Sequence, residues 1–332
     1  MSGGALTDRL ASGGLDAVVG VDVGGTNTVV GLFAPDLTRL AKASMPTLCA
    51  PSPGSSPSTA TSAFFDRLAV LIDGMIGASG ATRVRIGAGV PGRVRSEDGL
   101  ALRAVNLGWA NVPFAKELST RLGRDVVIDN DVRLYTLGET IAGAGAGCRT
   151  VVCAVLGTGM AVGAVVEGAL VRGSRSYAGE VGHDPVPGND AVCNCGNVGC
   201  LETIASATGI ARLARAAGLA NGDAAPLTAK QVGDAAAAGD PTAAAVFEAV
   251  GRTLAAKLVT VARLLDPDVV VIGGGAAEAG EPLLGPMRET FAAAYADPSL
   301  APPIRKGALG DDAGITGAAS FALLPTAGGR RG

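Results

Sequence analysis

The sequence predicts an α/β fold made of two halves that begin in the same way. Apolar runs typical of strands alternate with segments of helical spacing along the 332 residues, which is the pattern of α/β proteins. Each half opens with a buried strand, a turn containing Gly and Thr, and a returning strand: residues 18–22, 24–26 and 28–33, then residues 151–156, 157–159 and 160–166. Because ligands of such folds bind at the carboxyl ends of strands, both turns are candidate ligand sites.

The first half continues with alternating helices and strands. Strands are expected where short apolar runs stop at Pro, Gly or Asp, and the first helix where Phe, Leu, Ile and Met recur at helical spacing. Pro113 suits the first turn of a helix, where its missing N–H has no helical partner. The expected elements are a polar loop over 46–63, a helix over 63–76, a strand over 84–90, a helix over 113–122, a strand over 126–128 and a helix over 132–141.

The second half is mostly helical after its opening hairpin. An irregular segment over 174–200 holds the single His and three of the six Cys. Apolar runs of helical length follow it, and one short β-branched run ends in three glycines. The expected elements are helices over 203–217, 228–238 and 242–265, a strand over 269–272, and a last helix over 314–324.

Composition narrows the class of protein. The 27 basic and 30 acidic residues leave no positive excess to neutralise nucleic-acid phosphates. A hydrophobic content of 48% disfavours disorder as the main state. The first 16 residues lack the basic and apolar regions of a signal peptide, and the longest uncharged run, 150–166, is interrupted by the second glycine turn. We therefore expect a soluble, cytoplasmic protein that binds neither nucleic acid nor membrane.

The two glycine turns predict a phosphate clamp. Glycine lets backbone N–H groups approach an anion without a Cβ in the way, and threonine adds a hydroxyl donor. Either turn alone also fits an ordinary hairpin, but the pair, one after the first strand of each half, favours phosphate binding. Asp22 ends the first strand and is placed to hold a hydrated Mg²⁺. The turn residues are Gly24, Gly25, Thr26 and Asn27, and Gly157, Thr158 and Gly159.

Carboxylates follow the strand over 126–128. Asp131 is a candidate general base that accepts the proton of a substrate hydroxyl, with Asn130 orienting the substrate ring. The alternative is a helix cap, and we expect Asp129 or Asp131 to cap the helix that follows. Glu180 and Glu202 are candidates for accepting hydrogen bonds from sugar hydroxyls, against the plainer interpretation of solvated surface glutamates.

The single histidine lies near three cysteines in the pattern H-x9-C-x-C-x4-C. One imidazole and three thiolates suit a tetrahedral, closed Zn²⁺ site of structural type. Disulfides are the alternative, but a set of three cysteines in a chain without an export signal argues against them. The predicted ligands are His183, Cys193, Cys195 and Cys200, while Cys49, Cys148 and Cys153 are expected to be ordinary thiols.

A series of motifs, taken together and in order, resembles the ROK family, which contains bacterial glucokinases, related sugar kinases and repressors. The motifs extend over most of the chain, and the Gly-Glu-x-Gly-His segment with the cysteine cluster is the most specific part. They are D-V-G-G-T (22–26), V-P-G-R (90–93), D-N-D (129–131), L-G-T-G (156–159), G-E-V-G-H (179–183), C-N-C-G-N-V-G-C-L-E (193–202) and I-G-G-G (272–275).

The resemblance implies an actin-like, hexokinase-type ATPase fold whose two lobes close on ATP and a sugar. Residues 15–129 plus about 312–325 would form a smaller N-terminal lobe, and residues 130–311 a larger C-terminal lobe. Asp131 would be the base for the acceptor hydroxyl, usually O6 of a hexose, and His183 would hold zinc through one ring nitrogen. The implied sugar contacts are Gly92, Arg93, Asn106, Asn130, Glu180, His183 and Glu202. Gly24, Gly25, Thr26, Thr158 and Gly159 would hold phosphates, and Gly273, Gly274 and Gly275 the nucleoside.

Some positions depart from the family pattern and leave the substrate open. Asn27 stands where members often have Lys, Met160-Ala161 where the second turn often continues as Gly-Gly, and residues 184–192 lack the usual pattern. Glucose is the expected sugar; the alternatives are kanosamine, an N-acyl hexosamine or a cyclitol, with ATP or polyphosphate as donor. A repressor would need an N-terminal DNA-binding domain, and an inactive sugar-binding protein would not need Asp131. We expect ATP, Mg²⁺ and structural Zn²⁺ as cofactors, and a homodimer.

Overall fold

The structure, a computed structural model, describes residues 10, 13–47, 57–219 and 226–325. The chain divides into two compact units: unit 1 holds residues 1–142, 172–177 and 312–332, and unit 2 holds residues 143–171 and 178–311. The division falls after Ala142 instead of after residue 129, because the helix that follows residue 130 packs within unit 1. The units are also of similar size, not one small and one large.

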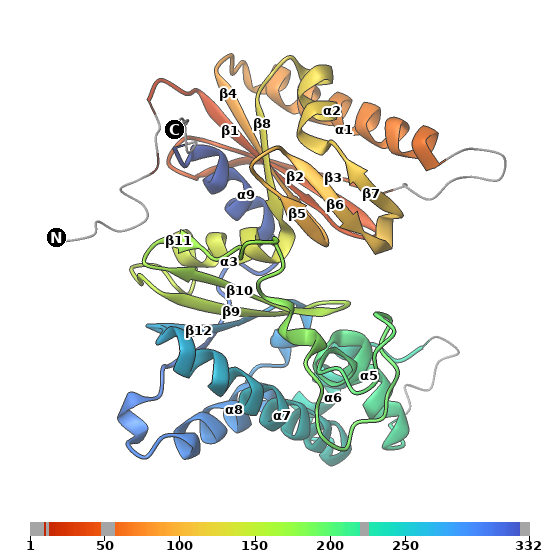
Figure 1. The fold of residues 1–332 in the computed structure, drawn as a ribbon, viewed down its shortest axis with the longest axis vertical. Coiled ribbons are helices and arrows are strands. Elements are labelled where there is room, and N and C mark those ends of the chain that lie inside the picture. The colour runs from red at the N-terminus through yellow and green to blue at the C-terminus, as the bar shows by residue number, and fades with distance from the viewer. Residues whose placement is uncertain (1–9, 11–12, 48–56, 220–225, 326–332) are drawn as a thin grey trace. The chain divides into compact units, whose positions relative to one another are not determined.

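Unit 1 is built on a five-stranded sheet in the order β3-β2-β1-β4-β8 (Figure 1). Strands β1, β4 and β8 run parallel, whereas β2 and β3 are antiparallel to their neighbours. Asp22 pairs with Gly89, and Gly89 with Asp129, so these three residues lie side by side at the carboxyl ends of the parallel strands. The strands are β1 (Ala17–Val23), β2 (Asn27–Phe33), β3 (Arg39–Pro46), β4 (Val84–Val90) and β8 (Val126–Asn130).

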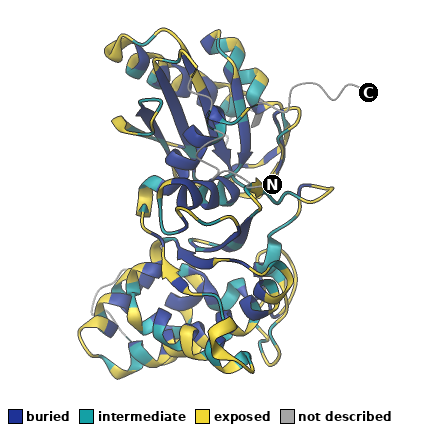
Figure 2. Cartoon of the chain, turned by 90° about the vertical axis from the view of Figure 1, so that its left-hand side faces the viewer, coloured by how far each residue is buried: buried dark blue, intermediate teal, exposed yellow. Residues whose placement is uncertain are grey.

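Helices cover both faces of this sheet (Figures 1 and 2). On one face α1 (Pro57–Ser79) and α2 (Phe114–Leu122) pack through a buried aromatic cluster: Phe64, Phe65, Trp109 and Phe114. On the other face α9 (Ala313–Leu323) lies on β1 and β4, and α3 (Asp131–Ala142) packs against α9. A small antiparallel sheet completes the unit: β5 (Arg93–Arg95), β6 (Leu100–Ala104) and β7 (Trp109–Val112).

Helices α3 and α9 approach each other to backbone contact, and this gives a testable prediction. A Cβ added to Gly317 would lie 1.7 Å from the carbonyl oxygen of Leu134. Gly317→Ala should therefore lower the free energy of unfolding by about 1–3 kcal/mol, the usual cost of overpacking. Gly74→Ala is the matched control, because Gly74 is exposed within α1 and an added Cβ meets nothing within 4 Å.

Urea denaturation of the two variants measures both effects. The control should raise stability by up to about 1 kcal/mol, since alanine favours a helix over glycine. Equal stability of Gly317→Ala and the parent protein would show that α3 and α9 can separate without cost.

Unit 2 repeats the sheet order of unit 1. Its sheet runs β11-β10-β9-β12-β13, again with an antiparallel hairpin followed by two strands parallel to its first member. The predicted likeness of the two halves is therefore confirmed at the level of strand order and direction. The strands are β9 (Val151–Leu156), β10 (Met160–Val166), β11 (Ala169–Leu170), β12 (Val269–Gly273) and β13 (Ile304–Lys306).

Helices pack over this second sheet around one apolar core. Val152, Ala154 and Ile272 of the sheet belong to the same buried cluster as Phe247 and Leu254 of α7. The helices are α4 (Glu202–Ala205), α5 (Ala207–Ala216), α6 (Ala229–Ala237), α7 (Pro241–Leu265) and α8 (Glu281–Ala294). Over the described residues, no helix is both long and apolar enough to cross a membrane.

The expected elements mostly agree with the structure, with three corrections. The loop expected over 46–63 is wrong from Pro57 onward, where α1 begins; residues 48–56 lie outside the described part of the chain. The helix expected over 203–217 is two helices divided at Ser206, whose hydroxyl accepts the Gly209 N–H and caps α5. Strands β3, β5, β6, β7, β11 and β13 and helix α8 were not predicted.

Candidate functional site

The first glycine turn connects β1 to β2 at the carboxyl end of β1. The Gly24 N–H donates to the Asn27 carbonyl at 3.0 Å, which closes a tight turn. Gly25, Thr26 and Asn27 are exposed, so their backbone and hydroxyl donors are accessible to an anion. Asn106 lies beside this turn, because a Cβ added to Gly25 would be 3.9 Å from the Asn106 Cβ. The structure thus brings a predicted sugar contact next to the predicted phosphate turn.

Asp22 and Asp131 lie close together below this turn. Burial, and secondarily the charge of Asp131, raise the pKa of Asp22 to about 7. Gly89 and Gly314 leave room for the two carboxylates: added Cβ atoms would lie 3.3 Å from the Asp131 Cα and 2.4 Å from the Asp22 Oδ2, respectively. Burial disfavours the charged form of Asp22, and a bound cation would stabilise that form. Asp22 is therefore a suitable ligand for Mg²⁺.

The pH dependence of stability follows from the raised pKa of Asp22. Between about pH 4, where an unfolded aspartate titrates, and pH 7, the folded protein keeps a proton that the unfolded chain releases. The free energy of unfolding should therefore fall as pH rises through this window, by up to about 1.4 kcal/mol per unit from this group. Urea denaturation at several pH values without Mg²⁺ or ATP measures the slope, and Asp22→Asn should flatten it. An unchanged slope in that variant would contradict the assignment.

The turn Asp129-Asn130-Asp131 joins β8 to α3. The helix cap is Asn130, whose Oδ1 accepts the Arg133 N–H at 3.1 Å; the expectation that Asp129 or Asp131 caps the helix is wrong. Asp131 Oδ1 accepts from Asn130 Nδ2 at 2.7 Å and from the Val132 N–H at 2.9 Å. Asn130 thus caps α3, and the turn itself fixes Asp131 Oδ1 through these two hydrogen bonds.

Asp129 is fully buried and ion-paired. Its Oδ1 lies 3.0 Å from Arg133 Nη1 and its Oδ2 lies 2.6 Å from Arg172 Nε. These two arginines distinguish Asp129 from Asp131 and leave Asp131 as the candidate base. Neither arginine was predicted as part of the site. Arg133 is only four residues from Asp129, but nothing local points to Arg172.

Gly92 lies close to the same turn. The Asn130 Nδ2 donates to the Gly92 carbonyl at 3.0 Å. Gly92 has φ +80°, and a Cβ there would be 2.2 Å from the Arg103 carbonyl oxygen, so both backbone conformation and space require glycine. Arg93 is exposed at the start of β5. Both predicted sugar contacts are therefore near Asn130, but the side chain of Asn130 itself binds protein groups.

The second glycine turn is held from several sides by residues of unit 2. The Ala207 N–H donates to the Gly157 carbonyl at 2.8 Å, and the Thr208 hydroxyl donates to the Thr158 carbonyl at 3.0 Å. Glu202 Oε2 accepts the Met160 N–H at 3.0 Å. Ala207 and Thr208, at the start of α5, were not predicted as part of this site.

The three glycines after β12 lie against this turn. Gly274 has φ +81°, and a Cβ on it would be 2.5 Å from the carbonyl oxygen of Leu156, the residue before Gly157. Gly273 ends β12 and Gly275 begins a short 3₁₀ helix, Gly275–Ala279. The predicted phosphate turn and the predicted nucleoside loop of unit 2 are thus neighbours.

The predicted zinc ligands form one cluster. Ligand atoms of His183, Cys193, Cys195 and Cys200 all lie within 4.8 Å of one another. The Cys195 and Cys200 sulfurs are 3.7 Å apart, and the Cys193 sulfur is 3.9 Å from His183 Nδ1. These spacings match the edge of about 3.8 Å expected for a tetrahedron of thiolates around zinc, and they are too long for a disulfide. The residues fit a zinc ion.

Two of the predicted sugar contacts, Glu180 and Glu202, adjoin this cluster. Glu180 Oε2 lies 3.7 Å from His183 Nε2, while the other ring nitrogen, Nδ1, is the one near the Cys193 sulfur. The Cys193 thiol donates to Glu202 Oε1 at 3.5 Å. Burial raises the pKa of Cys193 to about 12 when no ion is bound, so a metal would have to displace its proton. Glu202 thus connects the His183 and cysteine cluster to Met160 at the second glycine turn.

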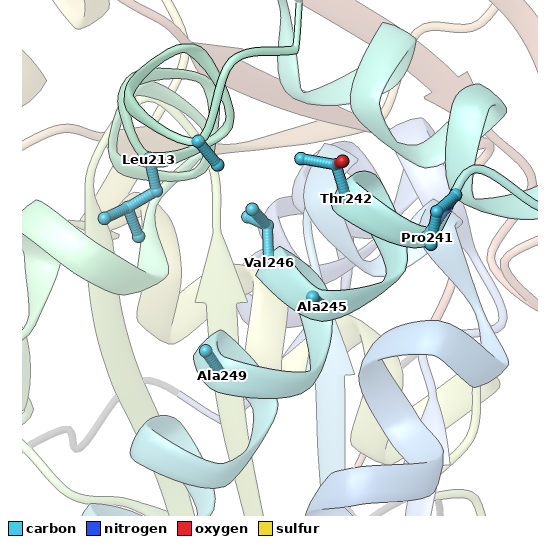
Figure 3. A pocket seen from close by; sticks show the side chains of 7 residues that line it. Leu213, Pro241, Thr242, Ala245, Val246 and Ala249 are labelled. Carbon is cyan, nitrogen blue, oxygen red and sulfur yellow. The ribbon is translucent and has the colours of Figure 1, made fainter.

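A separate cavity of about 570 Å³ lies between α5 and α7 (Figure 3). Leu213 and Val246 face each other across it, and its lining is largely apolar. None of the predicted site residues lines this cavity, so it is not part of the candidate site.

Two units of like sheet order, each with a glycine turn after its first strand, define an actin-like, hexokinase-type ATPase fold. The model of the ROK family matches residues 18–324, and the chain belongs to the ROK family. It is 36% identical over 311 residues to a glucokinase of Halalkalibacterium halodurans, covering 90% of this chain and 92% of that one.

Two further similar proteins have descriptions that state their own ligands. The N-acetylgalactosamine kinase AgaK of a Shewanella species is 31% identical over 316 residues, covering 90% of this chain and 94% of that one. The solved structure of a ROK family glucokinase from Streptomyces griseus in complex with glucose and AMPPNP matches with a TM-score of 0.79 and 29% identity. That match covers 93% of this chain and 100% of the other.

Proposed function

We propose that the chain is an ATP-dependent sugar kinase that transfers the γ-phosphoryl group of ATP to a hydroxyl of a hexose, with O6 of glucose as the expected acceptor. The observation that carries this is the position of Asp131, which lies beside Asp22 at the strand ends of unit 1. The membership of the chain in the ROK family supports the same activity. Its relatives include a glucokinase, and a further glucokinase whose structure was solved with glucose and AMPPNP.

In the proposed reaction, the protein promotes phosphoryl transfer by holding the acceptor hydroxyl and the phosphates of ATP in position. Asp131 accepts the proton of the acceptor hydroxyl, while Asn130 Nδ2 and the Val132 N–H hold its Oδ1 in place. The backbone donors of the two glycine turns bind phosphate oxygens and offset the charge that develops during transfer. Asp22 would hold Mg²⁺, which neutralises phosphate charge when bound.

The zinc-binding cluster shapes the sugar site in this proposal. One zinc ion on His183 and the three cysteines would fix the loop that carries His183 and Glu202. His183 Nε2, Glu180 and Glu202 of unit 2 would then bind sugar hydroxyls. Arg93 and Asn106 of unit 1 are proposed as sugar contacts on their own unit. In the structure Glu202 accepts from Met160 and Cys193, so sugar binding requires its carboxylate to share or exchange these partners.

We also propose that the protein acts as a homodimer.

The identity of the sugar is tested by a coupled ADP-release screen over glucose, N-acetylhexosamines, amino sugars including kanosamine, and cyclitols. We expect the highest kcat/KM with glucose; the AgaK relative makes N-acetylhexosamines the first alternative. A parallel arm replaces ATP with polyphosphate and measures the sugar phosphate directly. The absence of phosphoryl transfer to every sugar in both arms would reject the proposed function.

A further inference from the structure

Asp129 is the one buried acid of the base-bearing turn to which the proposed reaction gives no task. It is fully buried, and both of its carboxylate oxygens are engaged. Oδ1 accepts from Arg133 Nη1 at 3.0 Å and from the Asn130 N–H at 2.7 Å, and Oδ2 accepts from Arg172 Nε at 2.6 Å. Each carboxylate oxygen of Asp129 therefore accepts a charge-assisted hydrogen bond from an arginine. These bonds hold the turn that carries Asp131.

Arg172 comes from a different part of the chain. The segment Arg172–Tyr177 belongs to unit 1, although the residues on both sides of it belong to unit 2. Its guanidinium also lies 5.5 Å over the ring of Phe321 in α9. Arg172 is thus held between Asp129 and Phe321 at the point where the chain enters unit 1.

One arginine would be enough to neutralise Asp129. Arg133 lies on the first turn of α3, is almost fully buried and pairs with Asp129 at helical spacing. Asp129 pairs with two guanidinium groups, one more than a single carboxylate needs. This argues that Arg172 is used for position, since its Nε–H fixes one oxygen in one direction.

Hydrogen bonds of Asn130 connect Asp129 to Asp131. The Asn130 N–H bonds to Asp129, and the Asn130 side chain bonds to Asp131 at 2.7 Å. We propose that Arg172 is a positioning residue for the phosphoryl transfer, which through Asp129 fixes the turn that presents Asp131 to the acceptor hydroxyl. The proposal rests on the proposed function, in which Asp131 takes the proton.

Arg172→Lys tests this, because lysine keeps the charge but lacks the Nε–H donor and the flat group that stacks on Phe321. We expect kcat to fall by about 10- to 100-fold, the range for a catalytic group displaced by up to 1 Å. The KM for ATP should stay within about twofold, since the glycine turns are untouched. Arg263→Lys is the matched control: Arg263 also lies over an aromatic ring, Tyr295 at 5.4 Å, and kcat should not change.

Amide hydrogen exchange provides a readout that does not depend on activity. In Arg172→Lys the N–H groups of Asn130, Val132 and Arg133 should exchange faster, while β1 and β4 stay protected. If lysine at this site unfolds the protein, Phe321→Leu is the second variant, which removes only the ring beneath Arg172. It should change kcat and exchange in the same direction by a smaller factor.

The outcomes separate this proposal from the proposed function. Unchanged exchange at residues 130–133 in both Arg172→Lys and Phe321→Leu would overturn the positioning role, whatever happens to kcat. An unchanged kcat in Arg172→Lys, in a parent protein that phosphorylates a sugar, would also overturn it. A parent protein that phosphorylates no sugar would overturn the proposed function instead, and the exchange experiment would still decide whether Arg172 fixes the turn.

Discussion

Asp131→Asn should lower kcat for sugar phosphorylation by about 100- to 10,000-fold, the usual contribution of a general base. Asparagine has the same shape, and its Oδ1 can still accept from Asn130 Nδ2 and from the Val132 N–H, the two donors that hold Asp131. The turn should therefore keep its conformation, and the dissociation constant for the sugar, measured by calorimetry, should change only a few-fold. The effect should appear in kcat and not in binding, because the carboxylate acts on the proton that moves during transfer.

A control on the same strand makes this result specific. Asp125 precedes β8, at the end opposite to Asp131, and is exposed. Asp125→Asn changes the net charge by the same amount and should leave kcat unchanged. Turnover of Asp131→Asn within tenfold of the parent protein would mean that another group takes the proton.

Much of the fold could be predicted because its signals are local. Strands β1, β4, β9 and β12 are short apolar runs that stop at Gly or Pro, and the structure places them within a residue or two of the expected bounds. The cluster of His183 with three cysteines could also be predicted, since the cysteines lie within eight residues of one another.

The strands and helix that were not predicted have sequence patterns that are weak or that point to another structure. Strand β3 includes Arg39 and Lys42 and is at most half-buried along its length, so no apolar run marks it. Helix α8 contains Pro286 in its interior, a residue that predicts the end of a helix. The packing of unit 2 around Leu283 and Phe291 outweighs this local preference.

The candidate site could be predicted only as separate motifs. Asp22 and Asp131 are far apart in the sequence and meet because β1, β4 and β8 are parallel neighbours. The pairing of Arg172 with Asp129 depends on tertiary structure alone, because no periodicity or motif connects residues 43 positions apart. The cap at Asn130 was missed because acids and amides cap helices equally well.

Removal of the proposed zinc should have the second large effect. We expect about one zinc per chain by elemental analysis, and its loss in Cys200→Ser, which leaves three ligands of four. Binding of a structural zinc contributes directly to folding, so residues 184–200 should become sensitive to limited proteolysis. Sugar phosphorylation should fall by at least about 100-fold, more than the loss of an outer-shell partner, because His183 and Glu202 would no longer be fixed.

The same variant should also weaken nucleotide binding, for a reason visible in the hydrogen bonds of unit 2. Cys200 lies two residues before Glu202, whose carboxylate accepts the Met160 N–H at the end of the second glycine turn. Loss of the metal should release this contact, so the dissociation constant for AMPPNP should rise together with that for the sugar. Cys148→Ser is the matched control, since Cys148 is partly buried and lies outside the cluster. A metal-free protein that stays resistant to proteolysis and binds both ligands normally would show that the cluster is not a zinc site, and that the hydrogen bonds of Glu202 are enough to hold the turn.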